Sequence, residues 1–192
     1  MSACNLRSIV AAAALVAASA AGAADFTVSA KDNCACDNAT GAATVSLLAG
    51  QSFSVSVNPS QLWAAGDELR WSNADGLVGD RYATLNDGSG QPVGTQIGMS
   101  FGNLTQGSLA APYGALVGQI GGGDFFLVGT SYTGQAASAG LLKLYYWDAG
   151  SADNIGSITA SVNVSAVPEP GTYALMAGGL ALVGFLARRR RA

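Results

Sequence analysis

Residues 141–147, LLKLYYW, and residues 157–164, SITASVNV, decide the fold of this chain. Each run is rich in aromatic or β-branched residues or alternates between polar and apolar residues, and Gly, Asn and Ser residues lie at its ends. Each run therefore predicts a strand. Several short strands with no helix pattern between them predict an all-β fold, a small two-sheet antiparallel β-sandwich. Five further runs predict strands in the same way: Phe26 to Ala30, Thr44 to Leu48, Ser52 to Val57, Ala115 to Ile120 and Phe125 to Val128.

The N-terminal segment has the order of a secretory signal. Arg7 precedes the apolar run Ile9 to Ala18, and small residues follow up to Ala24. This pattern predicts export, with cleavage after Ala23 or Ala24. A buried N-terminal helix is the alternative, but it fits poorly because the run is apolar on all sides. Residues 1–24 are therefore interpreted as a signal peptide.

The C-terminus combines a proline motif, an apolar stretch and a basic end. Pro168-Glu169-Pro170 precedes the uncharged stretch Tyr173 to Ala187, and four arginines follow, Arg188, Arg189, Arg190 and Arg191. A helix of about 15 to 17 residues reaches roughly 23 to 26 Å, near the lower limit for crossing a bilayer. The arginines would stay in the cytoplasm, and the domain that precedes the helix would lie on the outer side of the membrane. The residues alone predict a single C-terminal transmembrane helix.

The order of these three features over Val167 to Ala192 resembles the PEP-CTERM sorting family. The resemblance implies an exosortase-type processing peptidase as a partner, removal of the helix, and a final place at the cell surface or in an extracellular matrix of exopolysaccharide. Membrane anchoring would then be transient, although a permanent tail anchor is the alternative. The chain divides into a signal peptide (1–24), a β-sandwich domain (25–166) and a sorting signal (167–192).

The domain between the two targeting segments is acidic. Residues 25–166 carry four basic and eleven acidic residues, a net charge of −7. This argues against nucleic acid or an anionic membrane as a partner and is compatible with divalent cations. The chain has no His, and it offers neither a lone reactive Cys nor a Ser with an evident base, so we expect no enzyme. Cys34-Ala35-Cys36 predicts an exposed loop with a local or intermolecular bridge.

The loop between the two runs quoted first carries hard oxygen ligands. Asp148, Asp153 and Asn154 lie on one short connection, where free backbone carbonyls could complete the about six to eight ligands that calcium prefers. The spacing is not that of an EF-hand. An acidic, Gly-rich turn with no metal is the alternative interpretation.

Four stretches carry a second resemblance: Leu62 to Gly66, Trp71 with Gly79-Asp80-Arg81, Tyr113 to Gly121, and Tyr145 to Val164. Together they resemble the galactophilic bacterial lectins of the PA-IL type, which are small calcium-dependent β-sandwiches. In that family the metal is held by a carboxylate, a pair of amides and backbone carbonyls. The metal residues that the resemblance implies here are Asp148, Asp153, Asn154, Ala65, Gly66 and Ala152.

The same resemblance implies a saccharide or exopolysaccharide as ligand, with Asp148 and Asn154 beside the sugar. The loop here is two residues shorter than in the family, and the sugar-contacting His of the family falls on Ala83, so we expect no strict galactose selectivity. The aromatic residues mostly predict core packing, and Trp71 is the preferred exposed residue for stacking on a sugar ring. The sequence predicts a calcium-assisted carbohydrate-binding domain. The alternative is a structural matrix protein in which calcium, if bound, only stabilises loops.

Overall fold

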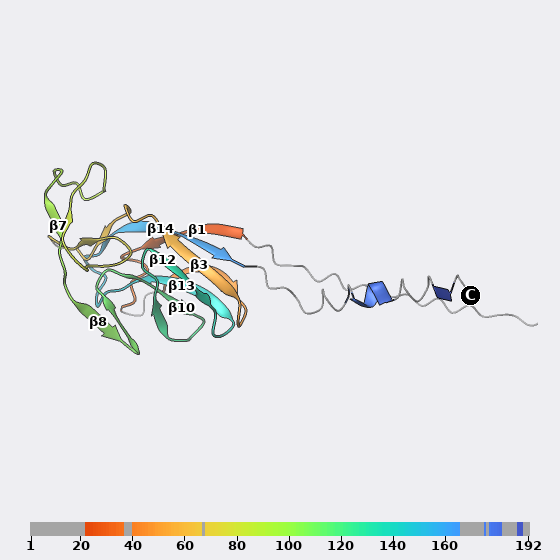
Figure 1. Ribbon diagram of the computed structural model, residues 1–192. Coiled ribbons are helices and arrows are strands. Elements are labelled where there is room, and N and C mark those ends of the chain that lie inside the picture. Colours follow the sequence, from red (N-terminus) through yellow and green to blue (C-terminus); the bar gives the residue numbers. More distant parts are fainter. Residues whose placement is uncertain are drawn as a thin grey trace, which may run out of the picture.

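The computed structural model describes residues 22–36, 40–66, 68–165, 175, 177–181 and 188–189 of the 192-residue chain. The domain consists of antiparallel strands in two main sheets and two ribbons (Figure 1). The larger sheet contains β1 (Gly22–Ser29), β3 (Ser52–Val57), β4 (Trp63–Ala64), β5 (Trp71–Ser72), β12 (Ser131–Gln135) and β14 (Ile155–Val164). The second sheet contains β2 (Ala42–Leu47), β10 (Leu116–Ile120), β11 (Phe125–Leu127) and β13 (Gly140–Tyr146). The ribbons pair β6 (Arg81–Tyr82) with β7 (Gln96–Gly98), and β8 (Asn103–Gln106) with β9 (Leu109–Pro112).

Strand β14 organises the larger sheet because it pairs on both sides. Its whole C-terminal part pairs with β1, from Ser29 opposite Ser157 to Gly22 opposite Val164. Its other side pairs first with β4 and then with β3. The start of β1 and the end of β14 therefore lie together at one end of the molecule, and β7 and β8 lie at the opposite end in Figure 1.

The core lies between the two sheets, because both contribute the side chains that are removed from solvent. Alternate residues of each strand point inward, as expected for a sandwich with one buried face per sheet. The larger sheet supplies Val28, Phe53, Val55, Ile158, Ala160 and Val162, and the second sheet supplies Leu47, Leu116, Leu142, Leu144 and Tyr146.

Strand β13 is also covered on its outer face, which explains why its sequence is almost continuously apolar. Tyr145 and the following Trp147 form a second small cluster with Val117. Leu104 and Leu109 of the β8–β9 ribbon pack against this cluster. A strand that is buried on both faces loses the simple alternation of a half-buried strand.

All seven strands predicted from the sequence are present, with boundaries shifted by a few residues. The predicted signal cleavage after Ala23 or Ala24 falls inside β1, and residues 1–21 lie outside the described part. The Pro168-Glu169-Pro170 motif and most of the predicted transmembrane helix also lie outside it. In the part of the chain that the structure describes, no helix has the length and apolar character needed to cross a bilayer.

Candidate functional site

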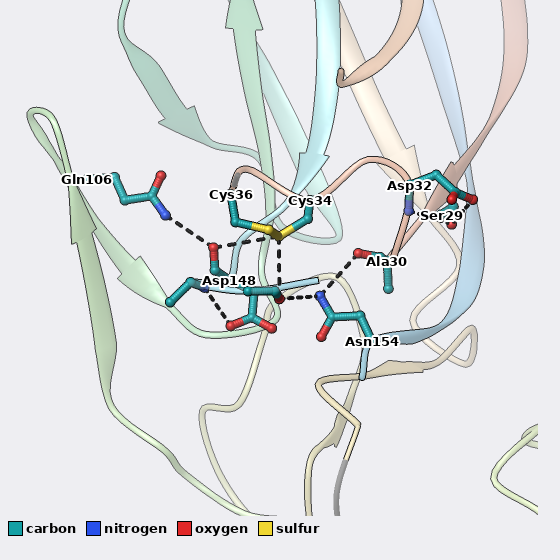
Figure 2. Close-up of a disulfide and its surroundings, with 10 residues drawn as sticks. Ser29, Ala30, Asp32, Cys34, Cys36, Gln106, Asp148 and Asn154 are labelled. Carbon is teal, nitrogen blue, oxygen red and sulfur yellow. Dashed lines mark hydrogen bonds between the residues drawn. A yellow bond between two sulfur atoms is a disulfide. The ribbon is translucent and has the colours of Figure 1, made fainter. Parts of the chain in front are cut away.

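The candidate site is the loop of residues 148–154, which joins β13 to β14. It lies against the turn after β1, residues 30–36, which we call the Cys turn. Figure 2 shows the two segments side by side. The turn is held in place by β13, because the N–H of Ala35 donates to the carbonyl of Tyr146 (2.8 Å) and the N–H of Tyr146 donates to the carbonyl of Asn33 (2.9 Å).

The Cys turn contains a disulfide between Cys34 and Cys36. The sequence predicted a local bridge on an exposed loop, and the exposed position is wrong, because Cys34 is fully buried and Cys36 nearly so. The Sγ of Cys34 lies 3.7 Å from the carbonyl oxygens of both Asp148 and Gly150 (Figure 2). The bridge is buried because it fills the space behind the candidate loop.

Hydrogen bonds fix the backbone of the loop on the side that faces the Cys turn. The side-chain oxygens of Asp148 and Asn154 lie on the opposite side (Figure 2). The Asn154 side-chain NH₂ donates to the carbonyls of Ala30 (3.2 Å) and Gly150 (3.0 Å). Gln106 donates to the carbonyl of Asp148 (3.1 Å). Figure 2 shows the Asp148 carboxylate and the Asn154 amide oxygen together on the side of the loop away from the disulfide. Both residues are buried, with exposed fractions of 8% and 2%.

Asp153 approaches the loop that follows β4. A Cβ built on Gly66 would lie 2.6 Å from the Cβ, the Cγ and the Oδ2 of Asp153. Gly66 also has a φ of +79°, which glycine adopts without the strain of a side chain. A residue with a side chain would therefore not fit between this loop and Asp153.

The electrostatics of the site reflect the burial of Asp148 and, to a smaller extent, the charge of Asp153. Burial raises the pKa of Asp148 above its ordinary value, and the charge of Asp153 raises it further. Hydrogen bonds from the Ala149 and Gly150 backbone and from the Asn154 side chain act in the opposite direction. The net effect raises the pKa of Asp148, so its charged form is less favoured here than that of an exposed aspartate.

Two buried polar atoms in the described part of the chain have no hydrogen-bond partner, and both belong to this region: the Asn154 Oδ1 and the Tyr146 hydroxyl. Burial raises the pKa of Tyr146, the charges of Asp148 and Asp153 raise it further, and the charge of Arg70 acts in the opposite direction. Buried polar groups are normally paired, and an unpaired one needs an explanation. The sequence assigned Tyr146 to core packing as one of the aromatic residues, and it missed Ala30, because only the contact between the Cys turn and the loop brings Ala30 to Asn154.

The remaining residues that the sequence singled out lie in different surroundings. Ala65 is buried beside Gly66, and its N–H donates to the carbonyl of Arg70 (3.3 Å). Ala152 is an exposed turn residue. Trp71 is half-buried rather than exposed, on β5 next to β4. Ala83 is buried and carries no polar group, so it cannot replace the missing His.

The donor set of the loop is the kind that a hard cation takes. Within the described ranges, no three or more His, Cys, Asp or Glu side chains are grouped so that they could hold a metal ion together, and the acidic residues of this loop are the pair Asp148 and Asp153. The unpaired Asn154 Oδ1 adds a neutral oxygen, as amide ligands do in calcium sites. A cation between these oxygens would satisfy the orphan acceptor and favour the charged form of Asp148.

Comparisons with known proteins identify the C-terminal segment. Residues 166–191 match the PEP-CTERM protein-sorting motif, which indicates an exported protein that is sorted to the cell surface and processed by an exosortase. No curated protein matches the chain. Among solved structures, the chain is similar to one described as "EclA N-terminal domain; PllA-like lectin", with 21% identity over 73% of this chain and 95% of that chain and a TM-score of 0.46. The chain thus carries the PEP-CTERM sorting motif behind a domain of antiparallel sheets.

Proposed function

We propose that this exported protein binds saccharides at the cell surface or in the surrounding exopolysaccharide, with calcium held by Asp148, Asp153 and Asn154. The observation that carries the proposal is the buried, unpartnered Oδ1 of Asn154 beside two carboxylates. A buried acceptor without a donor costs free energy, and a cation removes that cost. The proposal includes no catalytic activity.

The residues of the chain have distinct tasks in this function. Calcium, when bound, offers open coordination positions to neighbouring sugar hydroxyls. Asp148 supplies a carboxylate on a backbone fixed by the Cys turn, and Asn154 is oriented by its two donated hydrogen bonds. Gly66 leaves room for the Asp153 carboxylate. The loop is pre-organised, which lowers the entropic cost of binding.

Sugar selection is expected to be weak. A metal that takes two hydroxyls recognises their relative orientation, which several sugars share. Added hydrogen bonds would reject the wrong isomer, but Ala83 has no polar side chain and the chain has no His. Binding should therefore depend on calcium without strict preference for galactose.

The first prediction is that calcium raises the melting temperature of the purified protein and that Asp148→Asn removes this response. Binding to the folded state alone stabilises it by about 2.7 kcal/mol at 100 times the dissociation constant. The neutral amide keeps an acceptor for the Ala149 N–H, which Asp148 Oδ1 accepts at 2.6 Å, but it lacks the charge. Melting curves in millimolar calcium and in chelator measure the effect, and a glycan array under both conditions measures saccharide retention.

The control for this test is Asp124→Asn, which removes one exposed negative charge from the turn before β11. It should respond to calcium as the unaltered chain does. Identical melting curves with calcium and with chelator would contradict the metal site. A calcium response with no glycan bound would favour the alternative function, a structural surface protein whose loops are stabilised by the metal.

The second prediction concerns processing at the sorting motif. In a host that has the sorting peptidase, the mature protein should lack Tyr173 to Ala192, because the apolar stretch follows the Pro168-Glu169-Pro170 motif. Intact-mass measurement checks this. A Glu169→Ala variant should keep its tail, and recovery of the complete C-terminus from the unaltered chain would show the prediction to be wrong.

A further inference from the structure

Two clefts outside the Asp148 loop share Trp71 as a lining residue. The first, of about 360 Å³, is lined by Ser60, Gln61, Asn86 and Ser157 with Trp71, and we call it the Ser60 cleft. The second, of about 180 Å³, is lined by Gln91, Thr95 and Gln96 with Trp71, and we call it the Gln96 cleft. The Ser60 cleft is near the lower end of the roughly 300 to 1,000 Å³ of ordinary ligand sites and the Gln96 cleft is below it, so each would hold only a small part of an extended ligand.

One loop contributes to both clefts. The segment of residues 84–94 is closed at its base, where the N–H of Ala83 donates to the carbonyl of Thr95 (2.7 Å) and the N–H of Gly94 donates to the carbonyl of Ala83 (2.9 Å). Asn86 of this loop lines the Ser60 cleft, and Gln91 lines the Gln96 cleft. The half-buried indole of Trp71 is therefore a wall shared by two adjoining spaces beneath the same loop.

The backbone next to the clefts is in an unusual conformation. Among the residues that the structure describes, the non-glycine residues with positive φ are Leu69 (62°) and Asn86 (63°). Leu69 lines the Gln96 cleft and Asn86 lines the Ser60 cleft. A bulky residue with positive φ is a conformational outlier. Such strain gathers at ligand sites, where it fixes the position of groups that contact the ligand.

The chemistry of the lining selects a class of ligand. Gln96 donates from Nε2 to Asp80 and Gly98, and among the described residues nothing donates to its Oε1. The indole N–H of Trp71 likewise has no acceptor within the described residues. Neither cleft is lined by Lys or Arg, and each has one acidic lining residue, Asp87 in the Ser60 cleft and Glu68 in the Gln96 cleft. An anionic ligand such as a nucleic acid is therefore disfavoured here.

We propose that the two clefts form a binding site for a neutral saccharide chain, with one sugar unit in each cleft against Trp71. Such a chain has apolar C–H faces that suit an indole and hydroxyl edges that suit amides and hydroxyls. Trp71 offers a large contact area with few torsions to freeze. The site shares none of the proposed metal ligands, so its binding does not need calcium.

The two sites are neighbours on the larger sheet. Trp71 pairs with Ala64, and Ala64 pairs with Ile155, the residue after Asn154. Two strand spacings place the Cα of Trp71 about 10 Å from that of Ile155. A long chain could therefore contact both sites, and the test must separate them.

The third prediction follows from the environments of the three tryptophans. Trp63 and Trp147 are fully buried, so Trp71 dominates the fluorescence that acrylamide can quench. We expect cello-, manno- or galacto-oligosaccharides to protect Trp71 in the full chain, measured in chelator. Protection should increase with the length of the oligosaccharide, from one sugar unit to about three, since a longer chain fills both clefts. Calorimetry should show about tenfold weaker binding for Trp71→Ala and a smaller loss for Trp71→Phe.

Tyr82→Ala is the matched control, because Tyr82 is an exposed aromatic residue on β6, at the base of the 84–94 loop, and lines neither cleft. It should bind as the unaltered chain does. The proposal is overturned if no oligosaccharide of one to six units protects Trp71, if Trp71→Ala binds equally well, or if protection disappears in chelator. The last result would assign the binding to the Asp148 loop instead. If calcium fails to raise the melting temperature but oligosaccharides still protect Trp71, the Trp71 site stands and only the metal site is wrong.

Discussion

Trp63→Ala is expected to lower the free energy of unfolding by about 3 to 5 kcal/mol, the range for truncating a large buried aromatic residue. Trp63 is fully buried on β4, and its ring meets that of Tyr146 edge to face at 4.7 Å. Its indole N–H donates to the carbonyls of Gly114 (2.9 Å) and Asn73 (3.3 Å). The substitution therefore opens a cavity and also leaves a buried carbonyl of Asn73 without this donor. Urea unfolding followed by circular dichroism measures the change.

Two further variants test the reason for this effect. Trp63→Phe keeps the contact with Tyr146 and loses the N–H, so its cost should be clearly smaller. Trp71→Ala removes a half-buried indole that fills no core space, and it should also cost less. If Trp63→Ala were no more destabilising than Trp71→Ala, the core assigned to β4 would be wrong.

Gly66→Ala is expected to have the largest effect on the candidate metal site. Its added Cβ would lie 2.6 Å from the Cβ and the carboxylate of Asp153, so the whole side chain of Asp153 must move. Changes to groups that orient metal ligands cost about 10- to 100-fold in metal affinity. Titration of calcium against the melting temperature measures this loss.

Gly50→Ala is the control that separates the effect of the contact with Asp153 from the effect of a side chain at positive φ. Gly50 has a φ of +77°, close to the +79° of Gly66, and a Cβ there would meet nothing within 4 Å. Both variants should lose about 1 kcal/mol through a side chain at positive φ. Only Gly66→Ala should also weaken the calcium response. Equal calcium responses in the two variants would mean that Asp153 does not hold the metal.

The sequence predicted the strands whose pattern extends over several residues. Strands β3, β13 and β14 have runs of five residues or more with the expected composition. The two-residue strands β4 and β5 have no pattern of their own, because a period of two needs at least four residues to be recognised. Their positions depend on pairing with β14, which the sequence does not display.

The residues of the candidate site also differ in how far the sequence alone could predict their contacts. Asp148, Asp153 and Asn154 lie on one short loop, so their proximity was visible in the sequence. The approach of Gly66 to Asp153 was expected only from the resemblance to a lectin family, because 87 residues separate them. The buried position of Cys34 could not be predicted, since it results from contact with a loop 114 residues away.

The length of β14 separates the Asp148 loop from the C-terminal end of the domain. This strand of ten residues begins beside Asn154 and ends at Val164, two residues before the sorting motif starts at residue 166. At about 3.3 Å per residue it spans roughly 33 Å, so the C-terminal end of the domain and the Asp148 loop lie at opposite ends of this strand. A domain held by its C-terminal tail would turn this loop outward, whatever the rotation about the tether. Many copies on one surface would then present their loops to the same polymer, which favours avid binding even when each contact is weak.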